Sequence, residues 1–131
     1  MAPHLYLLDT SVCVPVLREK ASFQDLPAPD LTAFSSIVAA ELWAGACKSG
    51  REHPQFERVT EFLKLFEILD FSHDAARHYG EIQAELEKKG VSIGPLDLLI
   101  AAHARSLGAT LITANFGEFK RVKGLKVLAW R

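Results

Sequence analysis

One short stretch near the start of the chain sets its architecture: Leu5-Tyr6-Leu7-Leu8-Asp9-Thr10-Ser11. Its first four residues form a continuous apolar run, which is typical of a strand buried on both faces of a parallel sheet. Thr10 and Ser11 follow, and either can cap a helix that begins near Val12. We therefore expect Asp9 at the carboxyl end of a core strand, where packing explains a carboxylate poorly.

Strand and helix patterns alternate along the rest of the chain. The expected strands cover residues 5–8, 32–35, 67–71, 111–113 and 127–130. After the first helix, the expected helices cover residues 36–48, 54–66, 72–90 and 95–108, and a loop covers 24–31. This order predicts an α/β sandwich with a mainly parallel central sheet. Because no repeat or linker interrupts it, we expect one domain over residues 1–131.

The composition limits the class of protein. Of the 131 residues, 49% are hydrophobic, which is enough for a substantial core. The net charge is −1, from 15 basic and 16 acidic residues, so any contact with nucleic acid must come from a local patch. Cys13 and Cys47 are too few for a disulfide framework, and we expect both to be buried thiols. The chain has no signal peptide and no membrane-spanning run, so the expected location is the cytoplasm.

Two further acids lie inside apolar helices. Glu41 interrupts the apolar run of residues 37–46, and Asp97 immediately precedes the run of residues 98–102. Glu41 could occupy one exposed edge of its helix, and Asp97 could simply complement the helix dipole. An isolated buried carboxylate is costly, however, and three acids that converge with Asp9 would repel one another without a divalent cation. Oxygen ligands of this kind favour Mg²⁺ or Mn²⁺ over zinc.

Four segments resemble PIN-domain nucleases and, more narrowly, the VapC toxins of bacterial toxin–antitoxin modules. They are residues 7–11 (LLDTS), 36–42 (SIVAAEL), 93–104 (IGPLDLLIAAHA) and 110–125 (TLITANFGEFKRVKGL). The resemblance implies a PIN-like three-layer α/β/α sandwich and a metal-dependent endoribonuclease that cleaves structured RNA such as tRNA or rRNA. It also implies a homodimer, a VapB-type antitoxin that blocks the site, and a larger toxin–antitoxin complex on operator DNA through the antitoxin.

The resemblance also assigns roles to individual residues. The first three acids of the family correspond to Asp9, Glu41 and Asp97, as catalytic residues and metal ligands. Asn115 stands where many relatives have a fourth aspartate, and the nearby Glu118 is expected to supply the missing charge. This departure leaves open whether one or two ions bind. We expect the hydroxyls of three further residues to orient the carboxylates or bound waters, namely Thr10, Ser36 and Thr113.

A short basic cluster follows Asn115 in the sequence. Lys120, Arg121 and Lys123 could hold RNA phosphates despite the neutral total charge. The alternative is an ordinary solvated loop. Three more arginines are candidates for the same role, but their positions do not follow from the sequence: Arg18, Arg51 and Arg105.

Three other functions compete with the toxin hypothesis. A haloacid-dehalogenase-like phosphatase would need a second acid two residues after Asp9, where this chain has Ser11. A binding module without catalysis is supported only by Asn115, and the three acids argue against it. A PIN nuclease that processes RNA without an antitoxin remains open, although the short chain favours the toxin.

Overall fold

A computed structural model describes residues 4–18 and 25–130 of the chain. Five strands form one sheet in the order β3-β2-β1-β4-β5, and every neighbouring pair is parallel. The strands are β1 (Tyr6–Leu8), β2 (Thr32–Ser35), β3 (Glu67–Leu69), β4 (Thr110–Thr113) and β5 (Lys126–Ala129). The expected mainly parallel sheet is confirmed, with the first strand at its centre.

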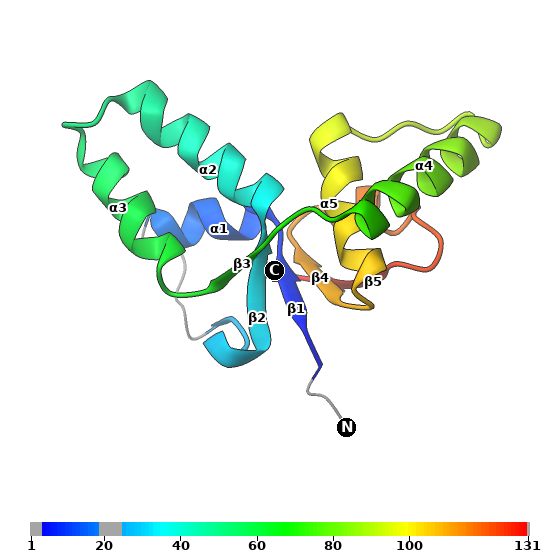
Figure 1. Cartoon of the computed structure of the whole chain (residues 1–131), viewed down its shortest axis with the longest axis horizontal. Coiled ribbons are helices and arrows are strands. Elements are labelled where there is room, and N and C mark those ends of the chain that lie inside the picture. The colour runs from blue at the N-terminus through cyan, green and yellow to red at the C-terminus, as the bar shows by residue number, and fades with distance from the viewer. Residues whose placement is uncertain (1–3, 19–24, 131) are drawn as a thin grey trace.

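Helices cover both faces of this sheet. They are α1 (Thr10–Leu17), α2 (Ser36–Ser49), α3 (Pro54–Leu63), α4 (His73–Lys88), α5 (Pro95–Ser106), α6 (Phe116–Phe119) and a 3₁₀ turn, η2 (Pro29–Leu31). Figure 1 shows α1, α2 and α3 on one side of the strands, with α4 and α5 on the other. The arrangement confirms the expected three-layer α/β/α sandwich.

The core forms around the central strand. Leu7 and Leu8 are only 1% and 0% exposed, because helices cover β1 on both faces. Next to them on β2, the ring of Phe34 contacts Phe62 and Phe66, with ring centroids 5.3 and 4.9 Å apart. The short apolar run at the start of the chain is therefore the buried strand that its composition predicts.

Several element boundaries differ from the expected ones. Helix α1 begins at Thr10 rather than near Val12, because the carbonyl of Asp9 accepts the first helical hydrogen bonds. Neither Thr10 nor Ser11 caps it. Helix α3 ends at Leu63, because the N–H groups of Lys64 and Leu65 donate to carbonyls three rather than four residues earlier. The elements η2 and α6 lie where no helix was expected. With three and four residues, they are too short to show a hydrophobic periodicity in the sequence.

The topology brings the first turns of α1, α2 and α5 to one edge of the sheet, and α1 begins there because it follows β1 directly. Helix α2 follows β2 directly, so its first turns lie beside the carboxyl ends of the strands. Helix α5 runs back towards the start of β4, so its first turn also lies at that edge. The chain builds β2 and β3 on one side of β1 and then β4 and β5 on the other. Ligands of open α/β sheets bind at such a switch point.

Two expectations about the chain as a whole can now be compared with the structure. Cys13 is buried in α1 as expected, whereas Cys47 is exposed on α2, so the expected burial of Cys47 is wrong. Leu42 and Ala46 carry the buried face of α2, whereas Cys47 lies on the exposed face together with Ala44. Among residues 4–18 and 25–130, no helix has the length and apolar character needed to cross a membrane.

A buried histidine joins the two halves of the sandwich. The Nδ1 atom of His103, on α5, lies 2.8 Å from the hydroxyl of Ser35. The same hydroxyl caps α2 by accepting the N–H of Ile37 at 3.1 Å. Burial lowers the pKa of His103 below its ordinary 6.5, against an opposing effect of Asp70. A neutral imidazole therefore holds α5 against the start of α2.

This burial predicts a pH-dependent stability. The unfolded chain protonates His103 near pH 6.5, and the folded chain does so only at lower pH. The contribution of His103 is therefore complete above pH 6.5 and is lost as the pH falls through the lowered folded value. We expect His103→Gln to flatten the fall in unfolding free energy below pH 6.5, measured by urea denaturation. The exposed His73→Gln is the control, and equal slopes in all three proteins would contradict the assignment.

Candidate active site

Asp9 is fixed by two hydroxyl groups at the carboxyl end of β1. Its side chain is buried at 3% exposure, and Oδ2 accepts hydrogen bonds from Ser11 and Thr113, each at 2.7 Å. Those hydroxyls are themselves held, because the N–H of Ala114 donates to Ser11 and the N–H of Asn115 donates to Thr113. Hydrogen bonds from the described residues thus orient one carboxylate oxygen and leave Oδ1 available.

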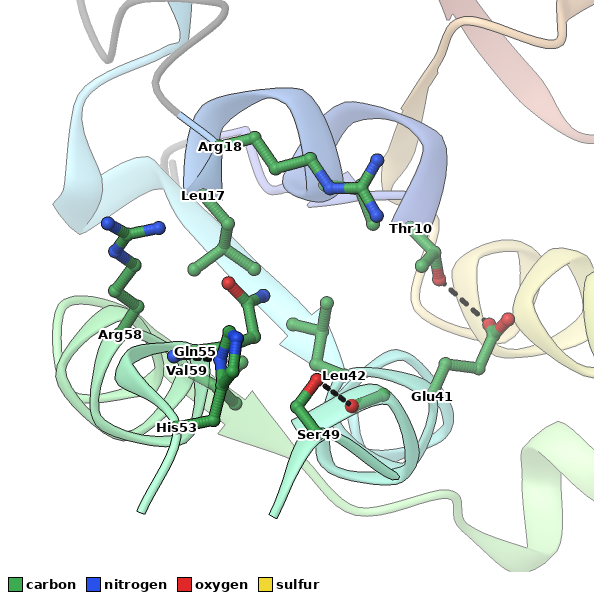
Figure 2. A pocket seen from close by; sticks show the side chains of 12 residues that line it. Thr10, Leu17, Arg18, Glu41, Leu42, Ser49, His53, Gln55, Arg58 and Val59 are labelled. Carbon is green, nitrogen blue, oxygen red and sulfur yellow. Dashed lines mark hydrogen bonds between the residues drawn. The ribbon is translucent and has the colours of Figure 1, made fainter. Parts of the chain in front are cut away.

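Glu41 lies in the second turn of α2, facing the start of α1. The hydroxyl of Thr10 donates to its Oε1 at 2.8 Å, as Figure 2 shows. Because Thr10 directly follows Asp9, this bond ties the first acid to the second through adjacent residues. The expected contact between Thr10 and a carboxylate is present, as is that between Thr113 and Asp9.

Asp97 lies close to three other acids at this edge of the sheet. It lies in the first turn of α5, in hydrogen-bonding contact with Glu118. Burial, followed by repulsion from Asp9, Glu118 and Glu41, raises the pKa of Asp97 to about 7. The three acids that the sequence indicates are therefore brought together, and Glu118 joins them.

Glu118 links α6 to the start of α5. Its Oε1 accepts the N–H of Gly94 at 3.0 Å, and the side-chain amide of Asn115 donates to its Oε2. The carboxylate thus stands directly beside Asp97 without an intervening residue. Asn115 lies at the same edge and turns its amide towards Glu118.

The neighbouring thiol is not an activated nucleophile. Burial raises the pKa of Cys13 well above its ordinary value, and the charges of Asp9 and Glu41 raise it further. At neutral pH the group stays protonated, and a protonated thiol is a poor nucleophile. Chemistry at this site depends on the carboxylates.

Ser36 does not have the position that the sequence reasoning assigned to it. Its hydroxyl accepts the N–H of Phe71 at 3.1 Å, which holds the segment after β3. The expected contact between Ser36 and a carboxylate is therefore absent among the described residues, whereas its expected role towards bound waters stays a prediction. Adjacent residues at a strand-to-helix junction point in different directions, and the preceding Ser35 bonds His103 instead.

The basic cluster after α6 is only partly free. The guanidinium of Arg121 donates to the carbonyl of Ser92 at 3.3 Å, which ties this turn to the segment before α5. Lys120 and Lys123 are exposed. Arg105 pairs with Glu81 at 2.9 Å and donates to the backbone carbonyl of Lys123. Arg105 is thus a structural link.

Ser11 is the residue that the sequence reasoning missed. It was considered only as a helix cap and as the reason to reject a phosphatase, yet its hydroxyl orients Asp9. A hydroxyl two residues after an acid at a strand end is the signal that could have identified it, because such side chains commonly bond nearby carboxylates and backbone groups.

The donor set fits a hard divalent cation. All four acidic side chains offer carboxylate oxygens, which suit Mg²⁺ or Mn²⁺, and Asp9 keeps one oxygen available. In the described part of the chain, no three His, Cys, Asp or Glu side chains are already arranged around a common point. Their oxygens bond hydroxyls, amides or one another instead, as expected for acids that repel.

Comparison with known proteins identifies the family. The PIN domain matches residues 6–125. Ribonuclease VapC2 of Rickettsia felis is 40% identical, covering 96% of this chain and 98% of that protein. The tRNA(fMet)-specific endonuclease VapC of Shigella flexneri is 36% identical, covering 95% and 97%.

A solved structure agrees with the sequence comparison. The crystal structure of VapBC2 from Rickettsia felis, bound to a DNA fragment from the promoter, superposes with a TM-score of 0.88. The two chains are 39% identical, and the match covers 97% of this chain and 99% of that one. With its parallel sheet and its acids at the carboxyl edge, the chain belongs to the PIN-domain family and, within it, to the VapC proteins.

Proposed function

We propose that this chain is a Mg²⁺- or Mn²⁺-dependent endoribonuclease that acts as the toxin of a type II toxin–antitoxin system. One observation carries the proposal: Asp9, Glu41 and Asp97 come from three separate elements and meet at the switch point of the sheet. Protein interiors avoid such clusters unless a cation offsets their charge. The names of the VapC relatives support the nuclease assignment.

The three acids and Glu118 would hold the ion. When bound, it supplies a Lewis acid that orients water and offsets the charge that develops on phosphate oxygens. Ser11 and Thr113 keep Oδ2 of Asp9 in place, and Oδ1 would be the oxygen offered to the ion. Thr10 does the same for Glu41. Asp97 has a pKa of about 7 and is partly neutral near that pH, and it would bind the ion in its ionised form.

The relatives support a substrate class and partners for the proposed function. A relative 36% identical is named a tRNA(fMet)-specific endonuclease, which supports structured RNA, and tRNA above rRNA, as the substrate. A relative of known structure is a VapBC complex on promoter DNA, which supports a VapB-type antitoxin and a DNA-bound complex for this chain. We also propose a homodimer acting in the cytoplasm, where its RNA substrate would be.

We expect the purified protein to cleave tRNA when Mg²⁺ or Mn²⁺ is present, and we expect EDTA to stop this cleavage. Asp9→Asn should lower the rate at least about 100-fold, because changes beyond the direct ligands of a metal already cost roughly 10–100-fold. Thr113→Ala should lower it about tenfold. Gel assays of labelled tRNA measure both rates. The exposed Asp30→Asn removes the same charge as a control, and equal cleavage by Asp9→Asn would refute the assignment.

The raised pKa of Asp97 predicts how the stability of the metal-free protein depends on pH. Its folded pKa of about 7 lies above the ordinary 3.8, so its contribution is complete below pH 3.8 and is lost as the pH rises through 7. Asp97→Asn removes the repelling charge. We expect it to raise the melting temperature in EDTA by about 3–6 °C at pH 8.

The gain from Asp97→Asn should be smaller at pH 5, where the folded parent already holds Asp97 protonated, and should approach zero only below pH 3.8. Added Mn²⁺ should stabilise the parent more than the variant. Differential scanning calorimetry at both pH values measures these shifts. A variant less stable than the parent at pH 8 would show that Asp97 serves structure rather than the site.

The toxin assignment predicts an effect on growth. Expression of the chain in a bacterial host should stop growth, and Asp9→Asn should not, because arrest requires RNA cleavage. Co-expression of a small reading frame adjacent to the gene should restore growth and co-purify with the chain. Cleavage without growth arrest or a neutralising neighbour would favour RNA processing instead.

A further inference from the structure

A cavity lies beside the acidic site, between α1, α2 and α3. Its volume is about 360 Å³, within the range of roughly 300–1,000 Å³ for sites that bind small ligands. Thr10 and Glu41 form part of its wall, so the cavity shares two residues with the active site. Figure 2 shows this bonded pair on one side and α3 on the other.

The cavity is lined by two cations that have no acidic partner within residues 4–18 and 25–130. The side chains of Arg18 and Arg58 line it, and neither guanidinium makes a hydrogen bond or ion pair with another described residue. By contrast, Arg77 pairs with two acids on α4. Glu41 is the sole acid among the described lining residues. In a chain of net charge −1, this is a local cationic site.

The two arginines lie at different places along the cavity. In Figure 2, the side chain of Arg18 extends from the end of α1 towards Thr10, and Arg58 rises from α3 on the side opposite Glu41. The cavity thus presents one guanidinium from the end of α1 and one from α3. His53 and Gln55, at the start of α3, add polar groups to the same wall.

Much of the remaining lining is apolar. Val14, Leu42 and Val59 each contribute to the cavity, one from each helix. A guanidinium binds phosphate through paired hydrogen bonds, and an apolar surface accepts a ribose or a base. Phosphate, ribose and base together make a nucleotide, and the cavity combines the complementary groups.

We propose that this cavity binds the nucleotide that flanks the cleaved phosphodiester bond of an RNA substrate, with Arg18 and Arg58 contacting its phosphate. The inference rests on the proposed ribonuclease function. An acidic protein segment could also contact arginines. The wall shared with Glu41 and Thr10 favours RNA, because cleavage at the acids requires the adjoining nucleotide to occupy the neighbouring space.

The test compares three variants with the parent, using a transcribed initiator tRNA as the probe and Mn²⁺ as the ion. The variants are Arg18→Gln, Arg58→Gln and the double variant, and Lys88→Gln is the control, an exposed cation on α4. We expect each single variant to raise KM about 3- to 10-fold and to leave kcat within about twofold. In a plot of log(1/KM) against log salt concentration, the slope should become about one unit less steep for each arginine removed.

Each outcome bears on the proposal. Unchanged KM and salt slope in the double variant, with an active parent, would overturn the cavity assignment and leave the nuclease intact. If the parent cleaves nothing, the proposed function fails, and fluorescence anisotropy with the same tRNA tests the cavity by itself. Equal tRNA binding by parent and double variant then overturns it. Loss of antitoxin binding with unchanged tRNA binding would assign the cavity to an acidic protein segment instead.

Discussion

Repulsion among carboxylates governs the architecture of this active site. Asp97 carries the clearest sign of it, because burial and the charges of its neighbours raise its pKa to about 7. Each of the other acids is held by donors of its own: hydroxyls on Asp9 and Glu41, and a backbone N–H with a side-chain amide on Glu118. These bonds keep like charges close before any ion is bound.

The rest of the fold can be understood as support for that arrangement. Strand β1 is buried on both faces, so the position of Asp9 is fixed by the core rather than by a loop. His103 joins the helix that carries Asp97 to the cap of the helix that carries Glu41. Substitutions in this link should therefore disturb the site without touching it, because preorganised sites depend on the residues behind them.

The sequence predicts the parts of the structure that depend on local pattern. The buried run before Asp9 and the acids inside apolar helices are unusual enough to identify strand, topology and site together. Ser36 bonds the backbone after β3 and Ser35 bonds His103, and hydrophobic periodicity indicates neither contact. Helix α6 is too short for a pattern, and the cavity with Arg18 and Arg58 exists only once α1 and α3 pack around α2.

Calorimetric titration of Mn²⁺ into the protein at pH 6 and pH 8, in buffers of different ionisation enthalpy, tests whether these acids form one cation site. Asp97 is mostly protonated at pH 6, so binding there should release close to one proton, and markedly less at pH 8. Asp97→Asn should abolish the release. Absence of Mn²⁺ binding, or an equal proton release at both pH values, would contradict a shared site built from these carboxylates.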